Sequence, residues 1–235
     1  MSSYQIAEQL GTSQRPVLQA LRERGVKRRN PSVRRTAIQE GVFDAVSPEM
    51  LYWLGFLYAD GSISGNRITL ALQERDVLHL EKFKQFLGIS NDITGYMPKA
   101  GQRVMRVSTR SQHIVDRLHE LGMDKKQPPL LAREESVDSR DFWRGMVDGD
   151  GTIMITSGGV VRLVLNGNQE LVEQFSIYCG HLVESKAQVV KHSSISRVSY
   201  SGKYARTLIA HFYQRAVVSL DRKQVAANAI IERSE

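Results

Sequence analysis

Hydrophobic and polar side chains alternate along residues 67–73, Arg-Ile-Thr-Leu-Ala-Leu-Gln. Successive side chains of a β-strand point to opposite faces, so this alternation predicts a strand that is buried on one side only. Its predicted core face consists of Ile68, Leu70 and Leu72. Its predicted polar face consists of Arg67, Thr69, Ala71 and Gln73.

A helical spacing follows this strand. Leu80, Phe83 and Leu87 recur at intervals of three and four residues, which predicts an amphipathic helix beginning at Val77. Further strands are expected near residues 93–96 and 103–109, and a helix over 114–121. The same order of elements is expected downstream, at residues 161–166, 171–178, 188–200 and 204–213. The pattern therefore predicts two α+β halves, each with an antiparallel sheet that has one polar face.

The two tryptophans of the chain lie in matching segments. Residues 53–63, Trp-Leu-Gly-Phe-Leu-Tyr-Ala-Asp-Gly-Ser-Ile, align without a gap with residues 143–153, Trp-Arg-Gly-Met-Val-Asp-Gly-Asp-Gly-Thr-Ile. Two further pairs of segments match in the same order, namely 83–88 with 175–180 and 123–127 with 220–224. Three matches in one order predict a tandem duplication.

Small residues recur at the same places in both tryptophan segments. Residues four apart share one face of a helix, so Gly55 and Ala59 form a stripe almost without side chains, as do Gly145 and Gly149. Such stripes let two helix backbones approach closely. We expect the two repeats to pack through these helices, with the C-terminal ends of both helices close together.

An aspartate stands at the predicted end of each of these helices. Asp60 and Asp150 each precede a glycine, Gly61 and Gly151, which suits a left-handed helix cap. A helix C-terminus carries partial negative charge and disfavours a carboxylate, and the expected packing brings two carboxylates together. Mg²⁺ would offset this charge, because it binds oxygen ligands and keeps several waters. The alternative is that Asp-Gly is simply a common turn after a helix.

Composition and charge narrow the class of protein. The chain has 235 residues, 41% of them hydrophobic and 24% charged, which is enough for a substantial core. Its net charge of +7 favours a polyanionic partner such as nucleic acid. Cys179 is the only cysteine, which excludes an intrachain disulfide and a cysteine-based zinc site. The longest apolar run, residues 51–59, is too short to span a bilayer. We expect a cytoplasmic protein, bacterial or phage-encoded.

Residues 53–61 and 143–151 resemble the paired motifs of the LAGLIDADG homing endonucleases. The first copy matches at Gly55, Ala59, Asp60 and Gly61, and the second at Gly145, Asp148, Asp150 and Gly151. Tryptophan replaces the usual leading leucine in both copies, and Tyr58 replaces the usual first aspartate. The resemblance covers about residues 48–235 and implies two αββαββα halves related by pseudo-two-fold symmetry. It also implies that the last acid of each motif binds metal and that curved sheets lie in the DNA major groove.

Asp148 has no acidic counterpart in the first copy. It lies about 200° around the helix from Asp150, so we expect a structural or solvated residue rather than a metal ligand. The six histidines show no repeated metal spacing and are expected at the surface or in packing. They are His79, His113, His119, His181, His192 and His211.

The resemblance implies further site residues. The family commonly places a lysine near the end of each repeat beside the scissile phosphate, which assigns Lys126 and Lys223; the alternative is that both are surface lysines in turns. A glutamine at the end of the first long strand often organises water, which assigns Gln73 and, as its second-repeat equivalent, Asn166. The sheet residues expected to contact DNA are Arg67, Thr69, Arg103, Arg162 and Arg197.

Residues 1–30 have the pattern of a helix-turn-helix. Gly11 would form the turn and Ser13 would cap the second helix. The apolar faces would consist of Ile6, Ala7 and Leu10 on one helix and of Val17, Leu18 and Leu21 on the other. The second helix of such modules enters the major groove, which makes Gln14, Arg15 and Gln19 candidate readers of base edges. A simple helical hairpin is the alternative.

A basic stretch follows, and it is expected to track phosphates and make affinity strongly dependent on salt. Its cations are Lys27, Arg28, Arg29, Arg34 and Arg35. A solubilising linker is the alternative. The expected domains are the helical module at 1–30, a basic linker at 31–47, one repeat at 48–133 and the second at 138–235.

These features together predict a site-specific, Mg²⁺-dependent endonuclease that hydrolyses both strands of a long DNA target, pseudo-palindromic or asymmetric. The protein is expected to act as a monomer, because one chain supplies both halves. Two alternatives remain open: a non-cleaving transcriptional regulator with the same fold, and an RNA-splicing maturase. Both aspartates are present, which favours the nuclease over the regulator.

Overall fold

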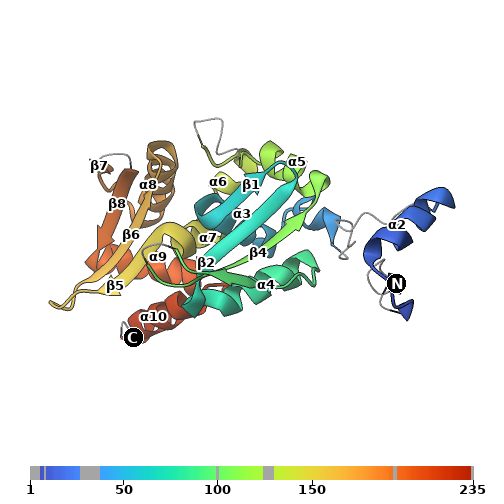
Figure 1. Ribbon diagram of the computed structural model, residues 1–235. Coiled ribbons are helices and arrows are strands. Elements are labelled where there is room, and N and C mark those ends of the chain that lie inside the picture. Colours follow the sequence, from blue (N-terminus) through green and yellow to red (C-terminus); the bar gives the residue numbers. More distant parts are fainter. Residues whose placement is uncertain are drawn as a thin grey trace. The chain divides into compact units, whose positions relative to one another are not determined.

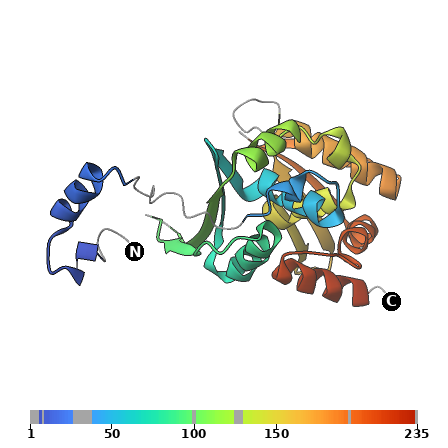
Figure 2. The same ribbon diagram turned by 90° about the vertical axis from the view of Figure 1, so that its right-hand side faces the viewer.

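A computed structural model describes residues 6–7, 9–26, 38–98, 101–123, 130–192 and 195–233 (Figures 1 and 2). The chain divides into two compact units, residues 1–36 and residues 37–235. Within the described ranges, no helix has the length and apolar character that crossing a membrane requires.

The first half of the larger unit follows the predicted order of elements. After η1 (Glu40–Phe43) the elements are α3 (Pro48–Asp60), β1 (Gly61–Ser64), β2 (Arg67–Gln73), η2 (Glu74–Asp76), α4 (Val77–Leu87), β3 (Thr94–Tyr96), β4 (Val104–Arg110) and α5 (Gln112–Glu120). The four strands form an antiparallel sheet in the order β1-β2-β4-β3. The alternation of β2 is confirmed, because Ile68, Leu70 and Leu72 are buried and Arg67 and Gln73 are exposed.

The second half repeats this plan. Its elements are α6 (Glu134–Val137), α7 (Arg140–Asp150), β5 (Gly151–Ile155), β6 (Val161–Gly167), α8 (Gln169–Val183), β7 (Val190–His192), β8 (Ile195–Ser201), α9 (Gly202–Tyr213) and α10 (Asp221–Glu232). The sheet order β5-β6-β8-β7 matches that of the first half. The predicted α+β architecture of two repeats with antiparallel sheets is confirmed. Figure 1 shows the two sheets on either side of the central helices α3 and α7.

Helices α3 and α7 start in the same way and form the centre of the body. Ser47 caps α3 by accepting a hydrogen bond from the Met50 backbone amide, and Ser139 accepts from the amides of Asp141 and Phe142 at the start of α7. Residues 50–58 of α3 are all buried, so the helix is covered on every side. A helix with this much apolar surface belongs in the interior of a domain.

Glycine allows α3 and α7 to touch backbone to backbone. A Cβ atom added to Gly55 would lie 2.0 Å from the Phe142 carbonyl oxygen, and one added to Gly145 would lie 2.2 Å from the Tyr52 carbonyl oxygen. One turn further along, Gly149 faces Ala59. Because both contacts advance by four residues on each helix, α3 and α7 run in the same direction and end side by side.

The predicted left-handed caps after both helices are wrong. Gly61 has a φ of −76° and Gly151 a φ of −93°, so both are extended and each begins a strand directly. Glycine is needed there for space instead. A Cβ on Gly61 would lie 2.6 Å from the Leu57 carbonyl oxygen, and one on Gly151 would lie 2.5 Å from that of Val147.

The smaller unit contains α2 (Gln14–Glu23), and Gly11 adopts the left-handed φ of 60° expected of a turn. Ala7 and Val17 are buried, but Leu10 is 68% exposed and Ser13 makes no capping hydrogen bond through its side chain, contrary to expectation. A short helical unit has too little surface to cover every apolar residue. The helix-turn-helix assignment stays a prediction.

The N-terminal edge of the larger unit lies within the range expected to be linker. The 3₁₀ helix η1 inserts Phe43 into the core, where this side chain is fully buried. Gln39 donates its backbone amide to the Leu87 carbonyl at the end of α4. Residues 38–47 are therefore part of the folded body.

Candidate active site

The two motif aspartates are brought to one place by the helix packing. Asp60 ends α3 and Asp150 ends α7. The Asp60 Oδ2 atom lies 3.3 Å from the point where a Cβ of Gly149 would stand, and Gly149 directly precedes Asp150. Asp60 is half-buried and Asp150 is exposed, so both can be reached from solvent. Two carboxylates thus meet at two negative helix ends.

A buried lysine lies against this pair of helix ends. Lys223, in the first turn of α10, is only 4% exposed, and its Nζ atom donates to the carbonyl oxygens of Val147, Asp148 and Gly151. Two of these carbonyls lie in the last turn of α7 and the third lies on Gly151 at the start of β5, so the ammonium group stands at the negative end of the helix, where a cation is stabilising. Burial lowers the pKa of Lys223 to about 8, although the nearby Asp148, Asp60 and Asp150 act to raise it.

The position of Lys223 bears on its expected role. The alternative of a surface lysine is wrong, because α10 packs this side chain into the body. An ammonium group has three protons, and the three carbonyl contacts use all of them. Lys223 would have to release a carbonyl before it could contact a phosphate. Its counterpart Lys126 lies outside the described residues.

The donor set at the helix ends fits a hard divalent cation. Two carboxylates from separate helices supply oxygen ligands, which Mg²⁺ and Ca²⁺ both prefer. No cluster of three or more His, Cys, Asp or Glu residues suited to a metal occurs within the described ranges. Two carboxylates would leave other coordination positions of a divalent cation to waters and phosphate oxygens.

Asp148 is structural, as expected, and is not solvated, since it is 1% exposed. Its carboxylate accepts hydrogen bonds from the Tyr52 hydroxyl at 2.8 Å, the Tyr213 hydroxyl at 2.5 Å and the Leu220 backbone amide at 2.7 Å. Burial raises the pKa of Asp148, while Lys223 and these hydrogen bonds act to lower it. The bonds fix the start of α10, and with it Lys223, to the end of α7.

The Asp148 network extends into the first repeat through His79. The Nε2 atom of His79 lies 2.8 Å from the Tyr52 hydroxyl oxygen. Because that hydroxyl donates its hydrogen to Asp148, Nε2 must carry a hydrogen and donate it to Tyr52. Burial lowers the pKa of His79 to about 3, which keeps the ring neutral. The expectation of a packing histidine is confirmed here, and the network itself was not predicted.

The open faces of the two sheets are basic. None of the eight strands of the described body contains an aspartate or glutamate. Five exposed arginines lie on the faces turned away from the core, and none of them forms an ion pair with another described residue. They are Arg67, Arg106, Arg110, Arg162 and Arg197. Each sheet therefore offers a surface suited to a polyanion.

Two of these arginines, Arg106 and Arg110, were not predicted. The register places Arg106 opposite Ala71 and Arg110 opposite Arg67, so they share the polar face of β2. The same alternation of buried and exposed positions, read outward from Val107, would have found them. Of the predicted contacts, Arg67, Arg162 and Arg197 are exposed and Thr69 is half-buried.

Arg103 differs from the other predicted DNA contacts. It precedes β4 and its guanidinium lies 3.1 Å from a carboxylate oxygen of Glu74, which partly offsets its charge. In the smaller unit Arg15 is exposed, and Gln19 donates to the Glu23 side chain within α2. The Gln14 side chain and the basic stretch containing Lys27, Arg28, Arg29, Arg34 and Arg35 lie outside the described residues.

The predicted equivalence of Gln73 and Asn166 is wrong. Leu70 pairs with Gly61, and Leu165 pairs with Gly151, so the counterpart of Asn166 is Ala71. The counterpart of Gln73 is Asn168, which caps α8. The turn between β5 and β6 spans residues 156–160, whereas that between β1 and β2 spans only 65–66. This difference shifts the alignment beyond the first strand of each repeat.

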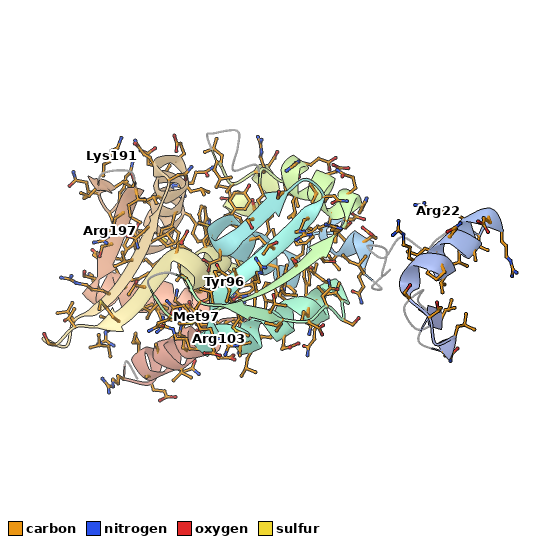
Figure 3. All side chains as sticks on the ribbon, viewed as in Figure 1. Arg22, Tyr96, Met97, Arg103, Lys191 and Arg197 are labelled. Carbon is orange, nitrogen blue, oxygen red and sulfur yellow. The ribbon has the colours of Figure 1, made fainter. Side chains whose placement is uncertain are left out.

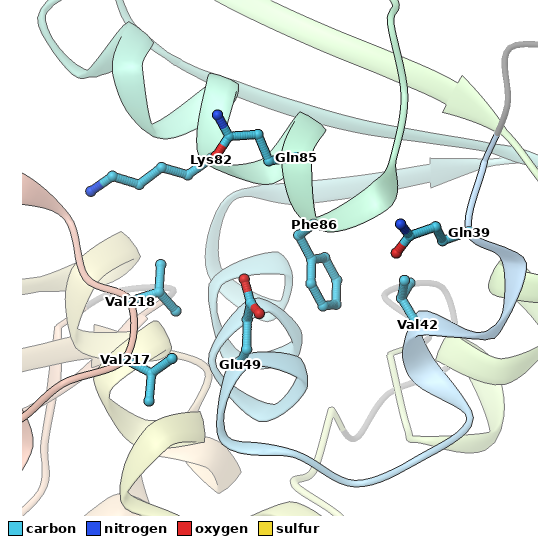
Figure 4. A pocket seen from close by; sticks show the side chains of 8 residues that line it. All are labelled: Gln39, Val42, Glu49, Lys82, Gln85, Phe86, Val217 and Val218. Carbon is cyan, nitrogen blue, oxygen red and sulfur yellow. The ribbon is translucent and has the colours of Figure 1, made fainter.

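A cavity of about 460 Å³ lies elsewhere, at the N-terminal end of α3 (Figure 4). Its lining includes Glu49, Lys82 and Phe86. Glu49 and Asp60 are separated by 11 residues of helix, which corresponds to roughly 16 Å. The cavity is therefore separate from the aspartates, and Lys82 is already bonded to Ser219 and Asp221.

Two antiparallel four-stranded sheets flank a parallel pair of helices that pack through glycine, and each helix ends in an aspartate. This arrangement is the LAGLIDADG homing endonuclease fold. Solved structures with this fold match the chain. I-SmaMI bound to uncleaved DNA in the presence of calcium ions has a TM-score of 0.55 and 12% identity, covering 81% of this chain and 92% of that one. The LAGLIDADG homing endonuclease I-GzeII in complex with its DNA target has a TM-score of 0.55 and 11% identity, with the same coverage.

A third solved structure, the LAGLIDADG meganuclease I-AabMI bound to uncleaved DNA, has a TM-score of 0.52 and 12% identity over 80% of this chain and 91% of that one. No protein-family model matches the sequence, and no curated protein sequence matches it. The shared property is the fold, which extends over nearly the full length of these structures.

Proposed function

We propose that the protein is a site-specific double-strand DNA endonuclease that requires a divalent cation, Mg²⁺ in the cell. The observation that carries this proposal is the meeting of Asp60 and Asp150 at adjacent helix ends, between two acid-free sheets with arginines on their open faces. The solved structures of the same fold are homing endonucleases bound to DNA, which supports the same partner here.

Each part of the site has a role in this proposal. Asp60 and Asp150 would hold the cation, whose charge would lower the pKa of a bound water and stabilise the leaving oxygen of a phosphodiester. Lys223 offsets the negative end of α7 and keeps the two carboxylates close in the absence of metal. The sheets bind one half of the target each, through arginines that contact phosphates and base edges. One chain supplies both halves, so the protein acts as a monomer.

The test begins with incubation of the full chain and Mg²⁺ with a randomised DNA library, followed by sequencing of the cut ends. On the selected target, Asp60→Asn and Asp150→Asn should each reduce double-strand cleavage by about a thousandfold, because each removes a ligand charge. Metal-free DNA binding, measured by gel shift, should stay unchanged. Undiminished cutting by either variant would contradict the site assignment.

The same assay separates the other classes of function. A regulator would bind a selected DNA sequence without Mg²⁺-dependent cutting by the wild type. A maturase would retain RNA splicing in the Asp60→Asn variant. Asp44→Asn is a matched control. Asp44 is an exposed acid bonded to His113, and it precedes the N-terminal end of α3, at the opposite end of this helix from Asp60.

A further inference from the structure

The two repeats treat one pair of equivalent residues differently. Arg197 on β8 and Arg106 on β4 occupy the same register position, opposite Asn166 on β6 and opposite Ala71 on β2. Their cross-strand partners, Ala71 and Asn166, each directly follow the leucine that pairs with the motif glycine of the same repeat. They are therefore the sheet arginines closest in register to the ends of α3 and α7.

In the second repeat this arginine is connected to the active-site end of α7. The Arg197 Nε atom donates to Asn166 Oδ1 at 2.8 Å, and the Nδ2 atom of Asn166 donates to the Asp150 carbonyl oxygen at 3.3 Å. Two hydrogen bonds thus link the guanidinium to the backbone of the aspartate. In the strand order β5-β6-β8-β7, a bond from β8 to β6 directs the Arg197 guanidinium toward the side of the sheet that holds β5, the strand that directly follows α7.

In the first repeat the equivalent arginine is drawn the opposite way. Ala71 has no group that could hold Arg106, and the guanidinium lies over the Tyr96 ring, 5.5 Å from its centre. Tyr96 belongs to β3, the edge strand at the opposite side of the sheet from β1. Figure 3 labels Arg197 on β8 and Tyr96 on β3. The Arg106 guanidinium is therefore directed toward β3, away from β1 and from Asp60, which directly precedes β1.

We propose that Asn166 positions Arg197 as a phosphate-binding cation beside Asp150, that the first repeat lacks this arrangement, and that the two strands of the DNA target are consequently cut at unequal rates. This inference rests on the proposed nuclease function. A guanidinium binds phosphate through two parallel hydrogen bonds and stabilises charge that develops on it. A guanidinium that is already held in place contributes more than one that must first leave an aromatic ring.

The test measures the cutting of each strand separately, with the two strands of the selected target labelled at different ends and Mg²⁺ added to the full chain. The wild type should cut one strand about tenfold faster than the other, which corresponds to one charge-assisted hydrogen bond. Asn166→Ala, which copies the first repeat, should slow only the fast strand. Ala71→Asn, the reciprocal change, should speed only the slow strand.

Lysine substitutions provide a second measurement that does not depend on Asn166. Arg197 and Arg106 are both exposed, so Arg197→Lys and Arg106→Lys should leave folding intact. Arg197→Lys should reduce the ratio of the two strand rates, and Arg106→Lys should not. Equal strand rates in the wild type, or equal slowing of both strands by Asn166→Ala, would overturn the inference and leave the nuclease proposal standing. An absence of any cutting by the wild type would instead refute the nuclease proposal.

Discussion

Helices α3 and α7 each end in an aspartate, but different hydrogen bonds hold the two ends in place. At the position two residues before the aspartate, the first repeat has Tyr58, whose hydroxyl donates to the carbonyl oxygens of Leu121 at 2.8 Å and Leu131 at 3.0 Å. The second repeat has Asp148 there, which accepts three hydrogen bonds and lies beside Lys223.

Both side chains tie a motif helix to the segment that follows the last αβ unit of its repeat. The first repeat uses a neutral donor and the second uses a buried charge. The comparison shows that a duplicated scaffold can keep its backbone geometry while exchanging hydrogen-bond donors for acceptors. The geometry is kept because both helices pass through one glycine-lined contact, which admits little variation.

The largest effect is expected at that shared contact. Gly55→Leu and Gly145→Leu should each destabilise the fold by about 4 kcal/mol or more, because the new side chain would meet a carbonyl oxygen of the partner helix rather than a mobile group. Urea unfolding measures the change. Gly158→Ala is the control, since its nearest atom would lie at 4.0 Å. Near wild-type stability in both leucine variants would contradict the parallel packing.

This contact, the alternating strand and the two-repeat architecture could be predicted from the sequence. Small residues four apart and alternating polarity are local patterns, and they hold in the structure at Gly55, Gly145 and along β2. The bonds among His79, Tyr52 and Asp148 join three separate elements, so no local pattern indicates them. The burial of Lys223 depends in the same way on how α10 packs onto α7.

The register error at Asn166 has a different origin. Pairing in a sheet is set by turn length as well as by residue type, and the longer turn at 156–160 changes the offset between equivalent residues of β2 and β6. The predicted pairing of Asn166 with Gln73 allows too few residues for this turn. The correct partner, Ala71, is visible only from the strand pairing with the motif glycines.

The second prediction concerns the different supports of the two helix ends. Asp148→Ala should cost about 3 to 4 kcal/mol, because it leaves two buried hydroxyls and a backbone amide without their acceptor and removes the carboxylate that offsets the charge of the buried Lys223. Tyr58→Phe should cost only about 1 kcal/mol, since it removes one neutral donor. Thermal and urea unfolding of both variants give the comparison. Equal losses would show that the two supports are energetically alike.

The third prediction uses the neutral state of His79. Its pKa is lowered to about 3 in the folded protein, whereas an unfolded histidine titrates near 6.5. As the pH falls below about 6.5, the unfolded chain therefore binds a proton that the folded chain does not, and stability decreases by about 2 kcal/mol by roughly pH 5.

The second repeat supplies the matched variant for this prediction. In the alignment of residues 83–88 with 175–180, His79 corresponds to Leu171, which is equally buried. His79→Leu should remove this loss of stability at low pH. The difference in unfolding free energy between the two proteins cancels the contribution of the carboxyl groups, which both proteins share. Parallel pH profiles for wild type and variant would show that His79 does not stay neutral.

The smallest effect is expected on the open sheet faces, and it compares the two halves directly. In the first sheet Arg110 stands opposite Arg67, whereas in the second sheet Ser201 stands opposite Arg162. Like charges directly opposite each other destabilise a strand pair. Arg110→Ser should therefore raise the free energy of unfolding by about 0.5 kcal/mol at low salt, and Ser201→Arg should lower it by a similar amount.

Binding to the selected DNA should respond in the opposite sense to these two substitutions. A contact between arginine and phosphate releases counterions, so Arg110→Ser should reduce the slope of log affinity against log salt by about 1, and Ser201→Arg should increase it by a similar amount. Urea unfolding and fluorescence anisotropy at several salt concentrations measure the two quantities. The Arg67–Arg110 pair would then weaken the sheet through repulsion and strengthen DNA binding through its two positive charges, as expected for a surface that binds a polyanion. If Arg110→Ser stabilises the fold and leaves the salt slope unchanged, this end of the first sheet lies outside the DNA contact.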